Sequence, residues 1–325
     1  TYPDLTLIEV DATTLFDAKA IEHSGIEFPS SYSSFRRQIE KLDVPTSIEC
    51  PALPPLIAHL QSVLALPNWL PAPKSSKSSF TGGEQAAQRH LNHYLSSSAV
   101  KRYKAVRNEL IGWENSSKLS AWLNIGNLSV RQIKQAIDHY ESAHGKNDGT
   151  EWLYVELLWR EFFQWLSLHQ GRSLFDFKGL AKQTPLTTFY PDRFKAWCQG
   201  STGYPIVNAC MNELRETGYL TNRGRQIAAS CLVNELQVDW RYGAAWFEHC
   251  LIDYNLGANW GNWQYIAGVG VDPRGGRQFN LQKQADTFDP DSLYRNQWAG
   301  DTTNLSTEDR LDAAGWPIGL VEVPK

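Results

Sequence analysis

The sequence predicts an all-α protein, and three observations support this prediction. Helix start and stop signals recur from residue 81 onward, apolar residues repeat at helical spacing, and no useful β-type alternation occurs after residue 20. The 325 residues are 42% hydrophobic and include 13 Trp, 13 Tyr and 13 Phe, which suffices for a large buried core. We therefore expect a helical domain over residues 81–325, preceded by a connecting segment over residues 1–80.

The connecting segment is recognised by its prolines. Short apolar pieces alternate with Pro in "CPALPPL" and "LPNWLPAPKSSKSS", a pattern typical of connecting structure with one or two short helices. The segment ends in a linker rich in Ser, Lys and Pro.

The first predicted helices carry clear end signals. After "GEQAAQRHLNHYL", the stretch "SVRQIKQAIDHYESAHG" offers a capping box of Ser129 and Gln132 and a stop at Gly145. The next stretch, "EWLYVELLWREFFQWLSLHQG", is apolar over most of its circumference and is followed by Gly171. It predicts a long helix buried on most sides.

Further helices are predicted over "YPIVNACMNELRETG", with Pro205 near its start and Gly218 at its end, then over "NRGRQIAASCLVNELQVDW" and "GAAWFEHCLIDYN". Neither G-x-G-x-x-G after a strand nor G-x-x-x-x-G-K-S/T occurs. A Rossmann-type or P-loop nucleotide site is therefore not supported.

Charge, cysteines and histidines limit the function classes. The net charge of −4 by itself argues against a nucleic-acid-binding protein, although "KRYKAVR" and "NRGR" are locally basic. Five widely spaced cysteines without a C-x-x-C pair indicate reduced core thiols in a cytoplasmic protein, and no window is apolar enough to span a membrane. His90 and His93 have no further ligands nearby, so we expect surface residues and no metal site.

Several polar residues are predicted on apolar helix faces: Glu156, Asn222, Arg225 and Asp253. They can form structural ion pairs between helices, which is the simpler alternative for any one of them. Together with the excess of aromatic residues, they favour a planar aromatic ligand with hydrogen-bonding edges. The stretch "NSSKLSAWL" can hold an anion through hydroxyls and backbone N–H groups, or can be an ordinary capped turn.

The order of these stretches resembles a known family. "SSKLSAWLNIGNLSVR", "WLYVELLWREFF", "AWCQGSTGYPIV", "TNRGRQIAASCLVNELQVDWRYGAAWFE" and "LIDYNLGANWGNWQYIAGVGVDPRGGRQFN" are similar to the flavin-binding helical domain of the photolyase/cryptochrome family. "TGGEQAA" and "NWGNWQYIAGVGVDPR" resemble its DASH-type cryptochromes. "VDATTLFDA" through "SSFRRQIE" then looks like the end of the family's N-terminal α/β domain and its connector, so residues 1–80 would be a remnant of that domain, most of which is absent.

The resemblance implies FAD as the cofactor. The residues that would contact its phosphates are Tyr103, Ser116, Ser117, Lys118, Leu119 and Ser120. Those expected beside its ring system are Arg225 paired with Asp253, then Tyr254, Asn255 and Asn259, of which Asn259 would face the reactive nitrogen. Asn255 departs from the family, which usually has Asp there. Trp263 would be the flavin-proximal member of a triad with Trp240 and Trp197 that passes electrons from the surface to photoexcited FAD.

The resemblance also implies a substrate and a reaction. The protein would be a deoxyribodipyrimidine photo-lyase that repairs cyclobutane pyrimidine dimers, mainly in single-stranded DNA. Excited, reduced FAD would donate an electron to the dimer, the ring would split, and the electron would return. Glu156 and Asn222 would bond the flipped-out dimer, while Trp159, Gln226 and Tyr265 would pack around it. The residues that would contact DNA are Arg107, Arg160, Arg223 and Gln284.

Two alternatives stay open. The chain can be a blue-light sensor of the cryptochrome type that binds DNA, RNA or a partner without repair, although Glu156, Asn222 and Trp159 favour repair. It can also be a truncated form that folds poorly or binds no flavin, because the absent domain would cover apolar surface. A methenyltetrahydrofolate antenna would require that domain. We expect a monomer whose partner is single-stranded DNA, with RNA and duplex DNA as further candidates.

Overall fold

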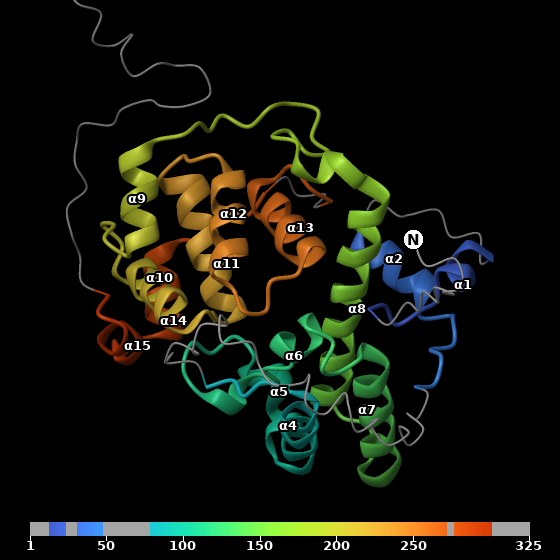
Figure 1. Cartoon of the computed structure of the whole chain (residues 1–325). Coiled ribbons are helices and arrows are strands. Elements are labelled where there is room, and N and C mark those ends of the chain that lie inside the picture. The colour runs from blue at the N-terminus through green and yellow to red at the C-terminus, as the bar shows by residue number, and fades with distance from the viewer. Residues whose placement is uncertain (1–12, 24–30, 48–78, 272–275, 301–325) are drawn as a thin grey trace, which may run out of the picture.

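The computed structural model describes residues 13–23, 31–47, 79–271 and 276–300 (Figure 1). The first α-helices are α1 (Ala18–His23), α2 (Tyr32–Ile39), α4 (Glu84–Ser96), α5 (Ala99–Val106), α6 (Ser120–Asn124), α7 (Val130–His144) and α8 (Asp148–Gln170). The later ones are α9 (Pro191–Gln199), α10 (Pro205–Thr217), α11 (Asn222–Ser230), α12 (Trp240–Cys250), α13 (Leu256–Ala267), α14 (Leu281–Phe288) and α15 (Leu293–Gln297).

The prediction of an all-α fold is confirmed. The described residues contain no strand, and the β-type pairing found among them is one isolated bridge between Thr188 and Val238. Much of the predicted α/β remnant falls on residues 1–12, 24–30 and 48–78, which lie outside the described ranges. Within those ranges, no helix combines the length and apolar character that a membrane crossing needs.

Most predicted helix ends are confirmed. Ser129 and Gln132 form the capping box of α7, and Gly145 follows its last residue with φ of 80°. Helix α8 ends before Gly171, and Gly218 ends α10 in the left-handed conformation with φ of 71°. Glycine adopts positive φ without steric cost, so these stops are readable from sequence.

Two helix boundaries differ from the prediction, and several observed helices were not predicted. The helix that starts at Asn222 ends at Ser230 and continues as a π-helical turn over Cys231–Glu235, so it does not reach Trp240. Helix α12 ends at Cys250, which places Asp253 in a loop and not on a helix face. The unpredicted helices include α9, α13, α14 and α15. In α13 the small residues and amides give no helical periodicity.

Helix α8 is the centre of the arrangement. In Figure 1 it runs between α1 and α2 on one side and α12 and α13 on the other, and it contacts α2, α5, α7 and α13. Two hydrophobic core clusters result. One is built mainly from α9 to α14, and the other from α4 to α8 together with the described part of residues 13–42. A cavity between these two clusters is lined by residues of both.

Glycines allow α13 to lie directly on α8. A Cβ atom at Gly257 would stand 2.5 Å from the Phe163 carbonyl oxygen, and one at Gly261 would stand 2.4 Å from Cδ1 of the Phe163 ring. Real Cβ atoms do not approach so closely, so these positions require glycine. The small residues of "ANWGNWQYIAG" thus bring the large ones, such as Trp263, against neighbouring helices.

The described N-terminal residues belong to the same core as α4 to α8. Leu15 and Phe16 are fully buried, and their backbone N–H groups donate to the Glu161 carboxylate over 2.8 and 3.3 Å. On α2, Phe35 and Ile39 are buried against α8. The N-terminal segment is therefore anchored on the middle of α8.

Candidate functional site

The cavity between the two core clusters has a volume of about 460 Å³. This size lies within the range of ligand pockets in proteins. Its lining includes most residues that the sequence analysis singled out: Tyr103, Arg107, Ser116, Ser117, Lys118, Leu119, Ser120, Glu156, Trp159, Arg160, Asn222, Arg223, Arg225, Gln226, Asp253, Tyr254, Asn255, Asn259, Trp263 and Tyr265. Trp197, Trp240 and Gln284 do not line it.

A buried ion pair joins α11 to the loop after α12. Nη2 of Arg225 lies 2.9 and 2.7 Å from the two carboxylate oxygens of Asp253, whose side chain is 2% exposed. Nε of the same guanidinium donates to the Leu220 carbonyl over 2.8 Å. The predicted pairing of Arg225 with Asp253 is confirmed, and these contacts fix both side chains in the cavity wall.

Lys118 is a buried cation without a carboxylate partner among the described residues. It is 5% exposed, its Nζ donates to the Tyr219 hydroxyl over 3.3 Å, and it stands 4.6 Å from the centre of the Tyr219 ring. Burial lowers the pKa of Lys118 to about 8. A buried ammonium is costly unless an anion compensates it, so this corner of the cavity fits the phosphate groups of a cofactor.

The segment around Lys118 is held by His90. Its Nε2 lies 2.7 Å from the Ser117 carbonyl oxygen, and its ring packs 4.7 Å from Trp122. The expectation that His90 lies on the surface is wrong, because the ring is half-buried among aromatic side chains, and this burial lowers its pKa. His93 is exposed and contacts Glu114. No group of three potential metal ligands occurs in the described ranges.

Two asparagines hold the start of α13 in place. Oδ1 of Asn255 accepts the backbone N–H of Ala258 over 3.0 Å and caps the helix. Nδ2 of Asn259 donates to the Ala244 carbonyl over 2.9 Å. The cap explains why Asn255 can replace the usual Asp, since either side chain offers an oxygen to the helix start. Its amide nitrogen remains as the group able to bond a ligand.

Glu156 is paired inside the protein. Its Oε1 lies 2.5 Å from Nη1 of Arg107 and 3.2 Å from Nε1 of Trp152. Burial raises the pKa of Glu156, which the Arg107 charge and these hydrogen bonds oppose. Arg107 was predicted to contact DNA, and its observed partner is instead this carboxylate. Likewise Arg160 donates to the Thr13 carbonyl over 2.5 Å.

Arg223 lies among aromatic and amide groups at the cavity wall. Its guanidinium stands 4.7 Å from the centre of the Phe288 ring, and Nη2 donates to Asn108 over 3.2 Å. Gln284 lies outside the cavity lining and contacts Nη1 of Arg223 at 3.4 Å. Asn222 is exposed, which corrects its predicted burial, because it is the first residue of α11 and not part of an inner face.

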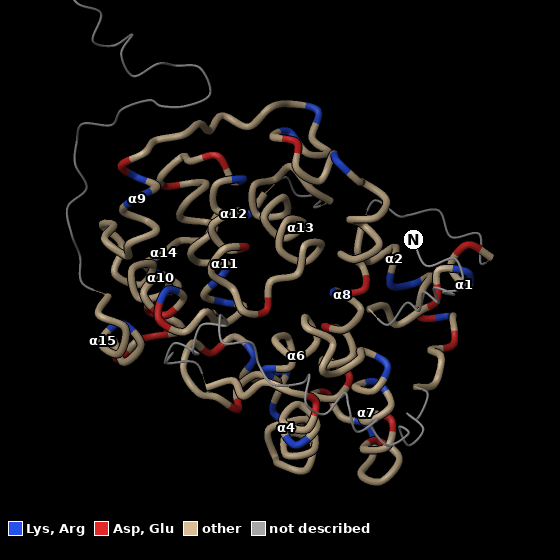
Figure 2. Tube along the Cα trace, viewed as in Figure 1, with Lys and Arg blue, Asp and Glu red and all other residues tan. Residues whose placement is uncertain are grey.

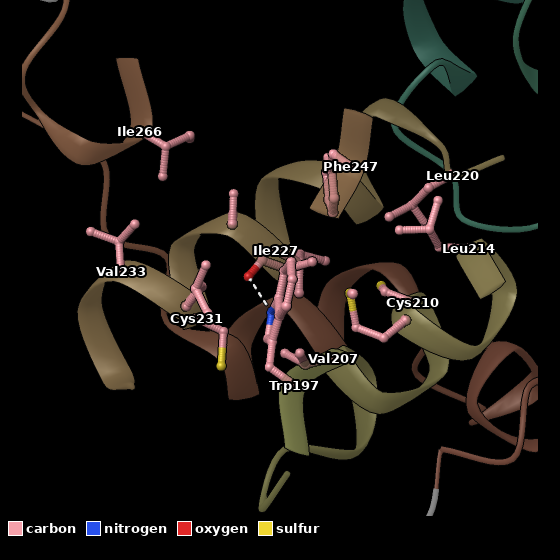
Figure 3. Packing of buried hydrophobic residues seen from close by; sticks show 14 of the residues in the cluster. Trp197, Val207, Cys210, Leu214, Leu220, Ile227, Cys231, Val233, Phe247 and Ile266 are labelled. Carbon is pink, nitrogen blue, oxygen red and sulfur yellow. Dashed lines mark hydrogen bonds between the residues drawn. The ribbon is translucent and has the colours of Figure 1, made fainter. Parts of the chain in front are cut away.

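The three predicted electron-transfer tryptophans are all buried. Trp263 lines the cavity and is 2% exposed, while Trp197 and Trp240 are 0% exposed. Figure 3 shows Trp197 inside the core cluster, with its indole N–H donating to the Ala228 carbonyl over 3.0 Å. None of the three tryptophans is therefore exposed at the surface.

Ring contacts join two of these tryptophans directly. The ring of Trp197 lies 6.1 Å from that of Trp263, and the ring of Trp240 lies 5.8 Å from that of Trp260. A role of these indoles in electron transfer stays a prediction.

Sequence reasoning missed Tyr219, which contacts both Lys118 and Arg225. Its ring centre stands 5.6 Å from the Arg225 guanidinium carbon. A signal was present, because Tyr219 lies between the stop at Gly218 and the N-cap Thr221, where the chain turns from one cavity helix to the next.

Known proteins share this architecture. Residues 152–316 match the family model described as the FAD binding domain of DNA photolyase. A cryptochrome DASH of Idiomarina loihiensis is 46% identical over 321 residues, which are 98% of this chain and 70% of that relative. The structure of a Synechocystis cryptochrome matches with a TM-score of 0.76 at 38% identity, and covers 88% of this chain and 61% of its own.

A bacterial class III photolyase from Agrobacterium tumefaciens matches with a TM-score of 0.70 at 29% identity, over 88% of this chain and 61% of its own. The chain thus spans less than two thirds of both solved proteins. The cavity, its buried cation and its ion pair fit a cofactor with phosphates and a ring with hydrogen-bonding edges. The chain belongs to the photolyase/cryptochrome family, within its DASH cryptochrome group, and carries the FAD-binding domain of that family.

Proposed function

We propose that this protein is a blue-light photolyase of the DASH type that repairs cyclobutane pyrimidine dimers, mainly in single-stranded DNA. One observation carries the proposal. The same cavity wall holds Glu156, Asn222 and Trp159 together with the Arg225–Asp253 pair. Groups suited to a damaged base and groups suited to a flavin thus face one space.

At the cofactor end, Lys118 and the hydroxyls of Ser116 and Ser120 would hold the phosphates of FAD. Asp253, fixed by Arg225, would bond the ring edge. FAD supplies the light absorption and the electron when it is bound. Buried side chains such as Trp263 exclude water from this end, which strengthens each polar contact there.

At the substrate end, aromatic side chains offer flat contact area. Trp159 and Tyr265 line the cavity with their ring centres 6.4 Å apart, at 75° to each other. Stacking on such rings contributes about 1–3 kcal/mol per base. Figure 2 shows acidic and basic residues interspersed along the chain. Electrostatic attraction to the phosphates of a DNA duplex would therefore come from short basic stretches. Flipping a base out of a single strand costs less free energy than flipping it out of a duplex, which favours a single-stranded substrate.

Glu156 would recognise the pyrimidine. Its Oε1 accepts hydrogen bonds from Arg107 and Trp152. Its Oε2 would accept a hydrogen bond from the imide N–H of a pyrimidine ring. Arg107 keeps the carboxylate oriented and opposes the effect of burial on its pKa. Asn222, exposed at the start of α11, can donate to a pyrimidine carbonyl oxygen from the other wall.

The test is repair by the purified, FAD-loaded protein under blue light. The substrates are a single-stranded and a double-stranded oligonucleotide that contain one thymine dimer, with a dark control. We expect repair of the single strand, lowered at least about tenfold in Glu156→Gln because a charged acceptor is lost. Glu151→Gln, an exposed change on the same helix, serves as the control. Bound flavin without repair of either substrate would refute the proposal and favour a light sensor.

A further inference from the structure

We propose that Tyr32, which lies outside the matched FAD-binding domain, is a positioning residue that sets the plane of the Trp159 indole in the cavity wall. The inference rests on the proposed function, in which Trp159 packs against the damaged base. It extends the substrate site to the N-terminal connecting segment.

Tyr32 and Trp159 form a close parallel stack. Their ring centres lie 3.6 Å apart with 9° between the planes. The Tyr32 hydroxyl donates to the Val155 carbonyl over 3.2 Å, and the ring meets Phe162 edge-on at 5.9 Å. Tyr32 is therefore held by three residues of α8 and covers one face of the indole.

The covered face limits how Trp159 can meet a ligand. The indole lines the cavity, and Phe162 and Tyr265 contact it edge-on at 6.0 and 6.4 Å. The ring of Phe163 is a further neighbour, with its centre 5.8 Å away and 26° between the planes, farther than the 3.6 Å of Tyr32. With one face occupied, the ring cannot turn about its side-chain bonds without breaking the stack. A flat ligand thus meets an indole that is already ordered, so binding does not have to order it.

The segment that carries Tyr32 is firmly docked. Ser31 caps α2, and Phe35 and Ile39 of that helix are buried, with Phe35 5.3 Å from Phe162. Two residues after Trp159 on α8, Glu161 accepts hydrogen bonds from the backbone N–H groups of Leu15 and Phe16. The N-terminal segment is thus held on α8 both before and after Trp159. The place of Tyr32 on α8 therefore determines how the Trp159 ring lies in the cavity wall.

The experiment compares Tyr32→Leu, which removes the stack, with Tyr32→Phe, which keeps the ring and loses the hydroxyl. Phe35→Leu is the matched control, because Phe35 docks α2 on Phe162 without stacking on Trp159. FAD content and urea denaturation first establish that each variant is folded and loaded. The dissociation constant for a single-stranded oligonucleotide with one thymine dimer is then measured in the dark.

We expect Tyr32→Leu to bind the dimer strand about 2- to 10-fold more weakly, the range that one aromatic pair supplies. Tyr32→Phe should bind like the unaltered protein, and FAD content should not change. Equal affinity in Tyr32→Leu, or an equal loss in Phe35→Leu, would overturn the proposal.

A second readout separates this proposal from the proposed function. In the flavin-free protein, the long-wavelength tryptophan bands of the near-ultraviolet circular dichroism, where tyrosine does not absorb, should differ between Tyr32→Leu and the unaltered protein, and this difference should vanish when Trp159→Phe is present in both. If the dimer strand binds no better than an undamaged strand, the proposed function fails while this spectral test still decides the stack. A spectral difference that persists without Trp159 would refute the positioning role.

Discussion

The Arg225–Asp253 pair allows a sharp test of the cavity. Asp253→Asn keeps the shape of the side chain and removes its charge, which leaves the guanidinium beside a neutral amide. Both N–O contacts are short, at 2.9 and 2.7 Å, and the carboxylate is 2% exposed. Breaking a buried pair by removing one partner costs about 3–5 kcal/mol. Because the Arg225 side chain is 27% exposed, water compensates in part, and we expect about 3 kcal/mol.

The assay is urea denaturation of the flavin-free protein, followed by tryptophan fluorescence. With slopes of about 1–3 kcal/mol per molar urea, the midpoint should fall by about 1 to 3 M. The control is Asp138→Asn, which breaks an exposed pair with Lys134 one helical turn away and should change stability by no more than about 0.5 kcal/mol. If both variants unfold at the same urea concentration, the pair does not stabilise the cavity as argued.

Three further predictions concern single residues. Burial raises the pKa of Glu213 from 4.5 to about 7, so its stabilising contribution is complete below the lower value and is lost as pH rises through the higher one. Glu213→Gln should make the fall in unfolding free energy between about pH 5 and 8 smaller. The control is the exposed Glu216→Gln, which should leave this fall as it is. An unchanged fall in Glu213→Gln, or an equal reduction in Glu216→Gln, would contradict the prediction. Gly261→Ala should destabilise the protein by about 1–3 kcal/mol in thermal unfolding, because its Cβ would strike the Phe163 ring, and Phe163→Leu should relieve most of that loss if the clash is its cause. Asn255→Ala should cost about 1 kcal/mol through loss of the helix cap while Asn255→Asp retains it, and equal stabilities of the two in urea would show that the cap contributes nothing.

The helices could be predicted where the stop or start is a local event. Ser129, Gly145 and Gly218 act through backbone geometry and hydrogen bonds within a few residues, and the structure has each in its predicted role. Helix α13 could not be predicted this way. Its glycines are selected by the approach of Phe163 from another helix, which no local pattern records.

The candidate site divides in the same manner. The residue types around the cavity, their order along the chain and the family they resemble were readable in the sequence. Which groups pair was readable only in part, since Arg225 and Asp253 meet as expected while Arg107 turns to Glu156. Burial was the least predictable property, as Asn222 shows by being exposed and not on a buried helix face.

The sequence by itself determined the helical class, most of the predicted helix ends and many of the residues that line one cavity. The tertiary structure alone decided that Tyr32 stacks on Trp159, that Tyr219 joins Lys118 to Arg225, and which of these side chains water can reach. Helix starts and stops depend on forces between near neighbours in the chain. Stacking, ion pairing and exclusion of water depend on segments that meet only after the helices have packed.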